Sequence, residues 1–230
     1  KEVGASIAGV TMAIKNSDQV TRNLATLTQD LGQALTSGQR RGQWGERMAE
    51  DILRAAGMIE GVQYERQQQI EGGTGRPDFT FYLPNQHLIH MDVKFPLDNY
   101  RKYLSAETEA EKAEASKQFL RQVRQHLRSI ETRGYTSGQG LTVDYVIVFI
   151  PNEQVYGFIH EQDEKILDEA LAMKLVMCSP FTLFAVLAVI RQAVENFKIS
   201  QQSHRILGLL GGFSKQWETY NEALEKLGRQ

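Results

Sequence analysis

The sequence predicts a layered α/β fold built around a mixed β-sheet. Short segments with strand-like alternation of apolar and polar residues lie in the first half of the chain, and an almost wholly apolar segment follows later. Segments with helical spacing precede, separate and follow these strands, an order that favours a sheet covered by helices. The expected strands are 62–70, 77–83, 88–95, 142–150 and 174–178.

Length and composition limit the class of protein. The chain has 230 residues, 41% hydrophobic residues and a net charge of −2. A chain of this length can bury a sizeable core without a disulfide or a structural metal. Its composition excludes collagen-like, mucin-like and wholly disordered chains. A single cysteine excludes an internal disulfide and cysteine zinc sites, and it favours a reducing compartment, the cytoplasm. No apolar run is long enough to cross a membrane.

Residues 2–37 are predicted to form one long helix, which divides the chain into a coiled-coil-like helix at 1–37 and a domain at 38–230. Two heptad tracks run through it, and seven of their ten positions are apolar. The tracks are Val3, Val10, Ser17, Leu24 and Leu31, and Ile7, Ile14, Thr21, Thr28 and Leu35. Two interpretations stay open: a coiled-coil seam that would join copies of the chain into a homo-oligomer, or an amphipathic helix folded onto the domain.

The next elements are a helix and a three-stranded meander. A helix is predicted over about 41–56, with Gly57 where a helix stop is expected. The strands at 62–70, 77–83 and 88–95 are close in sequence and are separated by turn residues. We therefore expect them to pair in an antiparallel meander.

The second half of the chain is predicted to be mostly helical. Its helices are expected at 105–133, 161–173, 181–207 and 213–228. The apolar strand 142–150 lies between the first two of these helices, and its composition is typical of a central strand covered on both faces.

Two carboxylates and a lysine are the candidate chemical site. Asp92 and Lys94 are two residues apart near the end of a strand, so their side chains share one face of the sheet. Asp78 begins the preceding strand. If the two strands pair through the turn at 84–87, Asp78 lies opposite Asp92. The alternative is a solvated strand face carrying a surface salt bridge.

Converging carboxylates repel one another, and a divalent metal relieves the repulsion. Hard oxygen ligands suit Mg²⁺ or Mn²⁺, which can activate a water molecule and stabilise charge on a phosphate. The backbone carbonyl of Val93 is a further candidate ligand. Glu46, on the helix before the sheet, lies at the edge of the apolar arc and could supply another carboxylate; its alternative role is a surface glutamate.

A basic stripe favours a nucleic-acid partner. Four basic residues spaced 4, 3 and 4 apart stack on one face of the helix at 105–133, and no acidic residue lies between 115 and 130. They are Lys117, Arg121, Arg124 and Arg128. The stripe suits contacts with DNA phosphates, whereas a plain solvated helix surface is the alternative.

Several sequence blocks in residues 40–230 resemble the RmuC family of bacterial DNA recombination proteins, within the PD-(D/E)xK nuclease superfamily. The blocks are Gly42-Gln43-Trp44-Gly45-Glu46, Tyr64-Glu65-Arg66-Gln67, Arg76-Pro77-Asp78, Asp92-Val93-Lys94-Phe95-Pro96-Leu97-Asp98-Asn99-Tyr100, Phe149-Ile150-Pro151-Asn152-Glu153 and Ser179-Pro180-Phe181-Thr182-Leu183. Many family members have Ser where this chain has Val93, a position expected to face away from the site.

The resemblance implies a restriction-endonuclease-like domain that hydrolyses DNA with Mg²⁺ or Mn²⁺ and limits DNA rearrangements. Glu46, Asp78 and Asp92 would be metal ligands, and Lys94 would orient the water or stabilise charge. It also implies a coiled coil or inner-membrane anchor before the domain, and the chain begins at Lys1 rather than Met. A fold that binds DNA or scaffolds a complex without cutting is the second hypothesis. A coiled-coil assembly protein is the third.

Overall fold

A computed structural model describes residues 37–67, 76–94, 96–133 and 142–228. Its elements in chain order are α2 (Gly38–Ala55), β1 (Tyr64–Arg66), β2 (Phe79–Tyr82), the 3₁₀ turn η1 (Pro84–Gln86), β3 (Leu88–Val93), α3 (Leu97–Ser105), α4 (Glu109–Glu131), β4 (Thr142–Phe149), α5 (Glu153–Gln162), α6 (Lys165–Ala172), β5 (Leu175–Cys178) and α7 (Pro180–Gly228). The helix expected at 2–37 lies outside the described residues, apart from Ser37.

The five strands form one mixed sheet in the order β1-β2-β3-β4-β5. The first three strands pair antiparallel, which confirms the predicted meander, and β4 and β5 add on in parallel. The central position of β4 accounts for its apolar sequence, because Val146 to Ile150 are all buried. The prediction of a mixed sheet flanked by helices is therefore confirmed.

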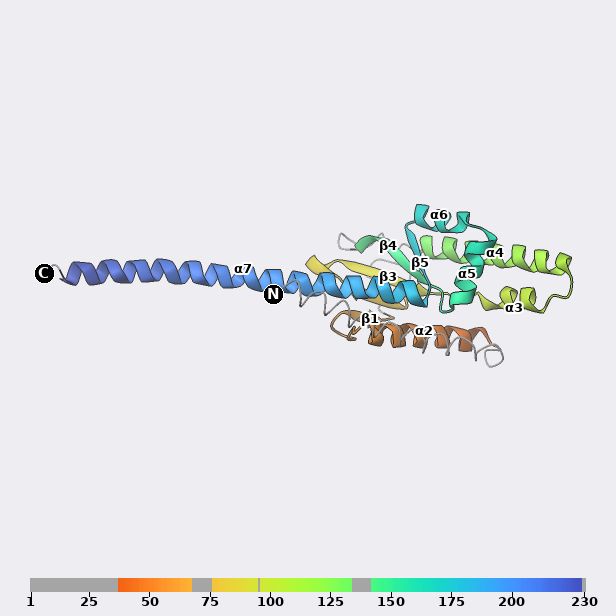
Figure 1. Cartoon of the computed structure of the whole chain (residues 1–230), viewed down its shortest axis with the longest axis horizontal. Helices are drawn as coiled ribbons and strands as arrows, with labels where there is room; N and C mark the ends of the chain where they lie inside the picture. The colour runs from red at the N-terminus through yellow and green to blue at the C-terminus, as the bar shows by residue number, and fades with distance from the viewer. Residues whose placement is uncertain (1–36, 68–75, 95, 134–141, 229–230) are drawn as a thin grey trace, which may run out of the picture.

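Helices cover both faces of the sheet (Figure 1). On one face, Phe119 and Val123 of α4 pack with Val146 and Val148 and with residues of α5 and α6. On the other face, Ile52 of α2 and Leu187 of α7 belong to a second core with Phe79, Met91 and Phe149. Alternate residues of β4 thus supply both cores, as the pleat of a strand requires.

Two helix predictions are confirmed except at their ends, and two further helices were missed. The helix expected over 105–133 is the single helix α4, which begins at Glu109 because Thr108 and Glu111 form a capping box there; the short helix α3 before it was not predicted. The helix expected over 161–173 is α6, which begins only at Lys165, because the extended Asp163 ends the preceding helix α5, and α5 was not predicted. Asn152, whose side chain accepts a hydrogen bond from the Val155 amide, caps the beginning of α5.

The two closing helices expected at 181–207 and 213–228 are a single helix, α7, of 49 residues. The glycines at 208, 211 and 212 lower helix propensity but leave the hydrogen-bonded ladder intact, and no proline follows Pro180 to interrupt it. The first turns of α7 pack on the sheet, and the rest extends beyond the domain (Figure 1). In the described part of the chain, no helix is both long and apolar enough to span a bilayer.

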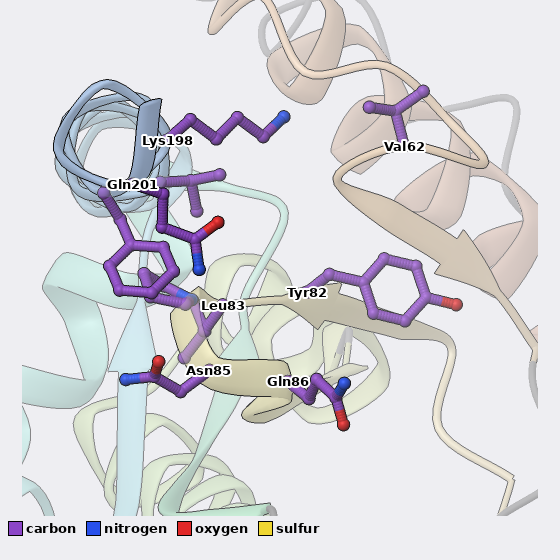
Figure 2. A pocket seen from close by; sticks show the side chains of 10 residues that line it. Val62, Tyr82, Leu83, Asn85, Gln86, Lys198 and Gln201 are labelled. Carbon is purple, nitrogen blue, oxygen red and sulfur yellow. The ribbon is translucent and has the colours of Figure 1, made fainter. Parts of the chain in front are cut away.

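A hollow of about 530 Å³ lies where α7 leaves the domain. Figure 2 shows Lys198 and Gln201 of α7 on one side of it, with Leu83, Asn85 and Gln86 from the turn after β2 below them. Asn85 and Gln86 have positive φ angles of 57° and 62°. Residues other than glycine rarely adopt positive φ angles, and where they do, as here, it is mainly in tight turns.

Candidate functional site

Asp78 and Asp92 lie side by side, as the register predicted. Phe79 pairs with Met91 across the antiparallel strands, so the next position places Asp78 opposite Asp92. The main chain joins the two strands at the same point, because the Val93 amide donates a hydrogen bond to Asp78 Oδ2 at 2.7 Å. The β-sheet thus fixes one carboxylate against the end of the neighbouring strand.

The environment of Asp78 disfavours its charge. Burial and the adjacent Asp92 carboxylate raise the pKa of Asp78 from 3.8 to about 6, although the Val93 amide and Lys94 act in the opposite direction. Glu46 makes a smaller contribution of the same sign as Asp92, so its charge lies within electrostatic range. The two carboxylates lie close together in a buried place where their charges repel, and a bound cation would relieve this repulsion.

Asp92 is the most enclosed group of the site, with only 1% of its side chain exposed. Its two oxygens accept from two different cations: Oδ1 from the Lys94 ammonium, and Oδ2 from Arg133 Nη1 at 2.7 Å. Lys94 Nζ also lies 3.5 Å from the Val93 carbonyl oxygen. Asp92, Lys94 and that carbonyl therefore meet at one point at the end of β3.

Two residues from the region of α4 reach the same corner. Arg133 follows the end of α4 and brings a half-exposed guanidinium to Asp92. His126 lies on α4, where burial and the positive charges of Lys94 and Arg133 lower its pKa while Asp92 raises it. A neutral imidazole beside this cluster is the expected form near pH 7.

Glu46 reaches the rim of the site because α2 packs closely on the sheet. A Cβ atom on Gly45 would lie 2.8 Å from Val93 Cγ1 and 3.1 Å from Pro151 Cγ, so only glycine allows this approach. The Val93 side chain accordingly points to α2 and away from the Asp92 face, as expected for a strand. Glu46 Oε2 accepts a hydrogen bond from Gln67 Nε2 at 3.4 Å.

The structure brings together Asp78, Asp92, Lys94 and the Val93 carbonyl, with Glu46 farther out. Within residues 37–67, 76–94, 96–133 and 142–228, no group of three or more His, Cys, Asp or Glu side chains is positioned to hold a metal. The nearest donor set is therefore two carboxylates and one carbonyl. Mg²⁺ is commonly held by one or two carboxylates together with water and substrate phosphates, so this smaller set suits it.

A hollow of about 500 Å³ adjoins Glu46 and is lined by residues of α2 and by Arg66 of β1. Arg66, on β1, forms a 2.8 Å ion pair there with Glu50. The other lining residues mix basic, amide and aromatic side chains: Arg40, Gln43, Trp44 and Arg47. Arginines beside a tryptophan are a combination that suits a phosphate backbone and an unstacked base.

The four basic residues of the stripe on α4 do not share the same surroundings. Arg124 Nε and Nη2 donate to the two carboxylate oxygens of Glu169 at 2.7 and 2.9 Å, and Nη2 also donates to Asp163 Oδ2 at 2.7 Å. These carboxylates raise the pKa of Arg124 further above its usual value and join α4 to α6. Lys117, Arg121 and Arg128 are exposed, so their predicted contact with phosphates remains open.

Sequence reasoning missed Arg133 and the partners of Arg124. Arg133 lies beyond the last turn of α4, where no periodic pattern relates it to Asp92, which is 41 residues earlier. Arg124 shares the spacing of the exposed basic residues, and only the packing of α5 and α6 distinguishes it. In both cases the contact is set by the tertiary structure and leaves no local pattern in the sequence.

Comparison with known proteins places the chain in a family. The RmuC family model matches residues 1–230, so the chain belongs to the RmuC family. Over 219 residues it is 26% identical to the "DNA recombination protein RmuC homolog" of Pseudomonas aeruginosa, covering 94% of this chain and 48% of that protein. It is 31% identical over 186 residues to the "DNA recombination protein RmuC" of Escherichia coli K12, covering 79% of this chain and 39% of that protein.

The "DNA recombination protein RmuC homolog" of Vibrio cholerae is 27% identical over 220 residues, covering 94% of this chain and 43% of that protein. The chain thus spans less than half the length of these relatives. No solved structure matches.

Proposed function

We propose that the chain is the nuclease-like part of a DNA recombination protein and hydrolyses DNA phosphodiester bonds with Mg²⁺ or Mn²⁺. The observation that carries the proposal is the meeting of Asp78, Asp92 and Lys94 at the end of β3. The names of the relatives, which are DNA recombination proteins, support a DNA substrate.

The order of elements supports the restriction-endonuclease-like arrangement implied by the sequence. A helix carrying Glu46 precedes three antiparallel strands, and a long helix then leads to a parallel strand. In this arrangement the acidic residues lie at the beginning of β2 and the end of β3, within reach of solvent at the Lys94 side chain, which is 20% exposed.

Each residue has a role that its contacts support. Asp78 and Asp92, with the Val93 carbonyl, would hold the metal ion, which when bound would activate water and stabilise charge on the phosphate. Lys94, held beside Asp92, would orient the attacking water or stabilise the charge that develops on the phosphate. Arg133 is placed to contact a phosphate oxygen once a metal neutralises Asp92.

The hollow beside Glu46 would receive the DNA strand next to the scissile bond. Arg40 and Arg47 are exposed there, and Trp44 could stack on a base. The exposed residues Lys117, Arg121 and Arg128 on α4 would add phosphate contacts farther from the site.

A catalytically silent DNA-binding or scaffolding protein is the second candidate. The observation that favours it is that the Asp92 carboxylate forms ion pairs with both Lys94 and Arg133. Two cations already compensate this carboxylate, so the fold does not need a metal ion to stabilise Asp92.

Cleavage of labelled linear and branched DNA with Mg²⁺ or Mn²⁺ distinguishes the two candidates. We expect Asp92→Asn and Lys94→Ala each to reduce the cleavage rate by about 100-fold or more, because each removes charge that acts on the reacting phosphate. Asp51→Asn, on the outer surface of α2, is the matched control and should cleave as the wild type does. Near-UV circular dichroism verifies that each variant is folded.

Equal cleavage by all four proteins would contradict the assigned site. No cleavage by any of them, with DNA binding retained, would support the silent alternative.

A further inference from the structure

Arg133 forms its ion pair with Asp92 from outside the sheet. Its Nη1 donates to Asp92 Oδ2 at 2.7 Å, whereas Lys94, two residues after Asp92 in the chain, contacts Oδ1. The Arg133 side chain is 39% exposed, although the side chain of Asp92 is almost wholly buried. One partner of this ion pair is therefore accessible from solvent, while the other is enclosed by the protein.

The guanidinium of Arg133 suits a phosphate as well as it suits a carboxylate. Both anions accept hydrogen bonds in the forked geometry that a guanidinium offers. Arg133 lies two residues beyond the end of α4, where its amide donates to the Ile130 carbonyl oxygen at 3.1 Å. A phosphate that approaches this corner from solvent therefore competes with Asp92 for the same side chain.

The charges at the end of β3 balance while Arg133 is in place. Asp78 and Asp92 carry two negative charges when both are ionised, and Lys94 and Arg133 carry two positive charges. Glu46 lies farther out and has the weakest influence on Asp78. Attraction and repulsion of a divalent cation then largely cancel, because each falls with distance in the same way. Moving Arg133 onto a phosphate leaves a net negative charge, which favours the cation.

We propose that Arg133 keeps this site in a resting form with low affinity for divalent cations, and that a DNA phosphate raises the affinity by drawing Arg133 from Asp92. The inference rests on the proposed function, which supplies both the DNA and the metal ion. DNA and the cation then bind cooperatively, and by thermodynamic linkage each raises the affinity for the other by the same factor. The protein thus acquires its metal ion when a DNA strand is in place.

Mn²⁺ binding to the 230-residue chain at pH 7.5 tests the resting form. Without DNA, Arg133→Gln should bind Mn²⁺ about 10-fold more tightly than the wild type, because it removes the competing charge. Arg133→Lys keeps that charge and should bind as weakly as the wild type. Lys112→Gln is the matched control, since it removes one positive charge from an exposed ion pair at the opposite end of α4. Electron paramagnetic resonance of free Mn²⁺ measures each affinity.

Asp78→Asn identifies the site at which the affinity changes. Combined with Arg133→Gln, it should abolish the increase in Mn²⁺ affinity, because it replaces one of the two carboxylates by a neutral amide. An increase that survives in the double variant would overturn the proposal by placing the cation elsewhere. Equal Mn²⁺ affinity of Arg133→Gln and the wild type would also overturn it. Near-UV circular dichroism verifies that the variants are folded.

The wild type by itself provides a test that requires no variant to fold. A saturating short single-stranded oligonucleotide should raise its Mn²⁺ affinity by about 10-fold, after subtraction of the Mn²⁺ that the oligonucleotide binds alone. In Arg133→Gln the increase should be smaller, because the competing charge is already absent. An unchanged Mn²⁺ affinity of the wild type in the presence of the oligonucleotide would contradict the proposal.

Gel electrophoresis of the same samples separates this inference from the proposed nuclease activity. Cooperative binding of Mn²⁺ and DNA without cleavage would support the role of Arg133 and contradict the nuclease. Cleavage without cooperative binding would support the nuclease and overturn the role of Arg133.

Discussion

Asp78 shows how one residue can link stability to the site. Its pKa in the folded protein, about 6, is above the ordinary value of 3.8 because burial and Asp92 disfavour the charge. The folded protein therefore retains a proton over a pH range in which the unfolded chain has lost it. The stabilisation is complete below about pH 3.8 and is lost as the pH rises through about 6.

Asp78→Asn should remove this dependence, since the amide stays neutral and its oxygen can still accept from the Val93 amide. A shift of this size corresponds to about 3 kcal/mol. We expect the variant to match the wild type near pH 4 and to be more stable by up to about 3 kcal/mol at pH 8. Urea unfolding in EDTA at the two pH values measures the difference. The same difference at both would contradict the cause assigned to the pKa.

At the scale of the element, the contact of α2 with the sheet depends on Gly45. A methyl group there would meet Val93 and Pro151, and both of these neighbours are conformationally stiff. The closeness of this contact is what brings Glu46 to the rim beside Asp78. A single residue without a side chain thus positions a whole helix.

Gly45→Ala should destabilise the fold by about 1–3 kcal/mol because the added methyl group overpacks the contact. Gly42→Ala is the matched control, since nothing lies within 4 Å of its added Cβ and alanine is the better helix former. The control should gain about 0.5–1 kcal/mol. Thermal or urea unfolding measures both, and an equal gain at the two positions would contradict the close packing of α2.

The chain as a whole is nearly neutral, so any affinity for DNA must come from local surfaces. The exposed part of the α4 stripe is one such surface, whereas Arg124 is engaged with Asp163 and Glu169 and supports the packing of α4 on α5 and α6. Residues that share a helix face can therefore serve different purposes in the molecule.

The salt dependence of DNA binding should separate these purposes. Removing Lys117 and Arg121 together by alanine substitution should flatten the slope of log Kd against log salt by about one per lost phosphate contact. Arg124→Gln should leave the slope unchanged and lower stability by about 1 kcal/mol. Fluorescence anisotropy from 50 to 300 mM salt measures the slope. A wild-type slope in the Lys117 and Arg121 variant would contradict the role of the stripe.

The sequence by itself determined the elements whose signals are local. Alternating apolar residues and turn residues predicted the meander and its register, and so placed Asp78 beside Asp92. The apolar run of β4 predicted a strand covered on both faces. These predictions succeeded because period and turn chemistry act over a few residues and dictate which side chains share a face.

The tertiary structure decided what depends on distant residues. It paired Asp92 with Arg133 and Arg124 with Glu169, contacts between residues 41 and 45 positions apart that no local pattern encodes. It also made α7 a single helix across its glycines. Propensity is a weak local preference, and a helix continues wherever no proline or competing cap interrupts its hydrogen bonds. The site is thus a local pattern completed by the packing of α2 and α4 on the sheet.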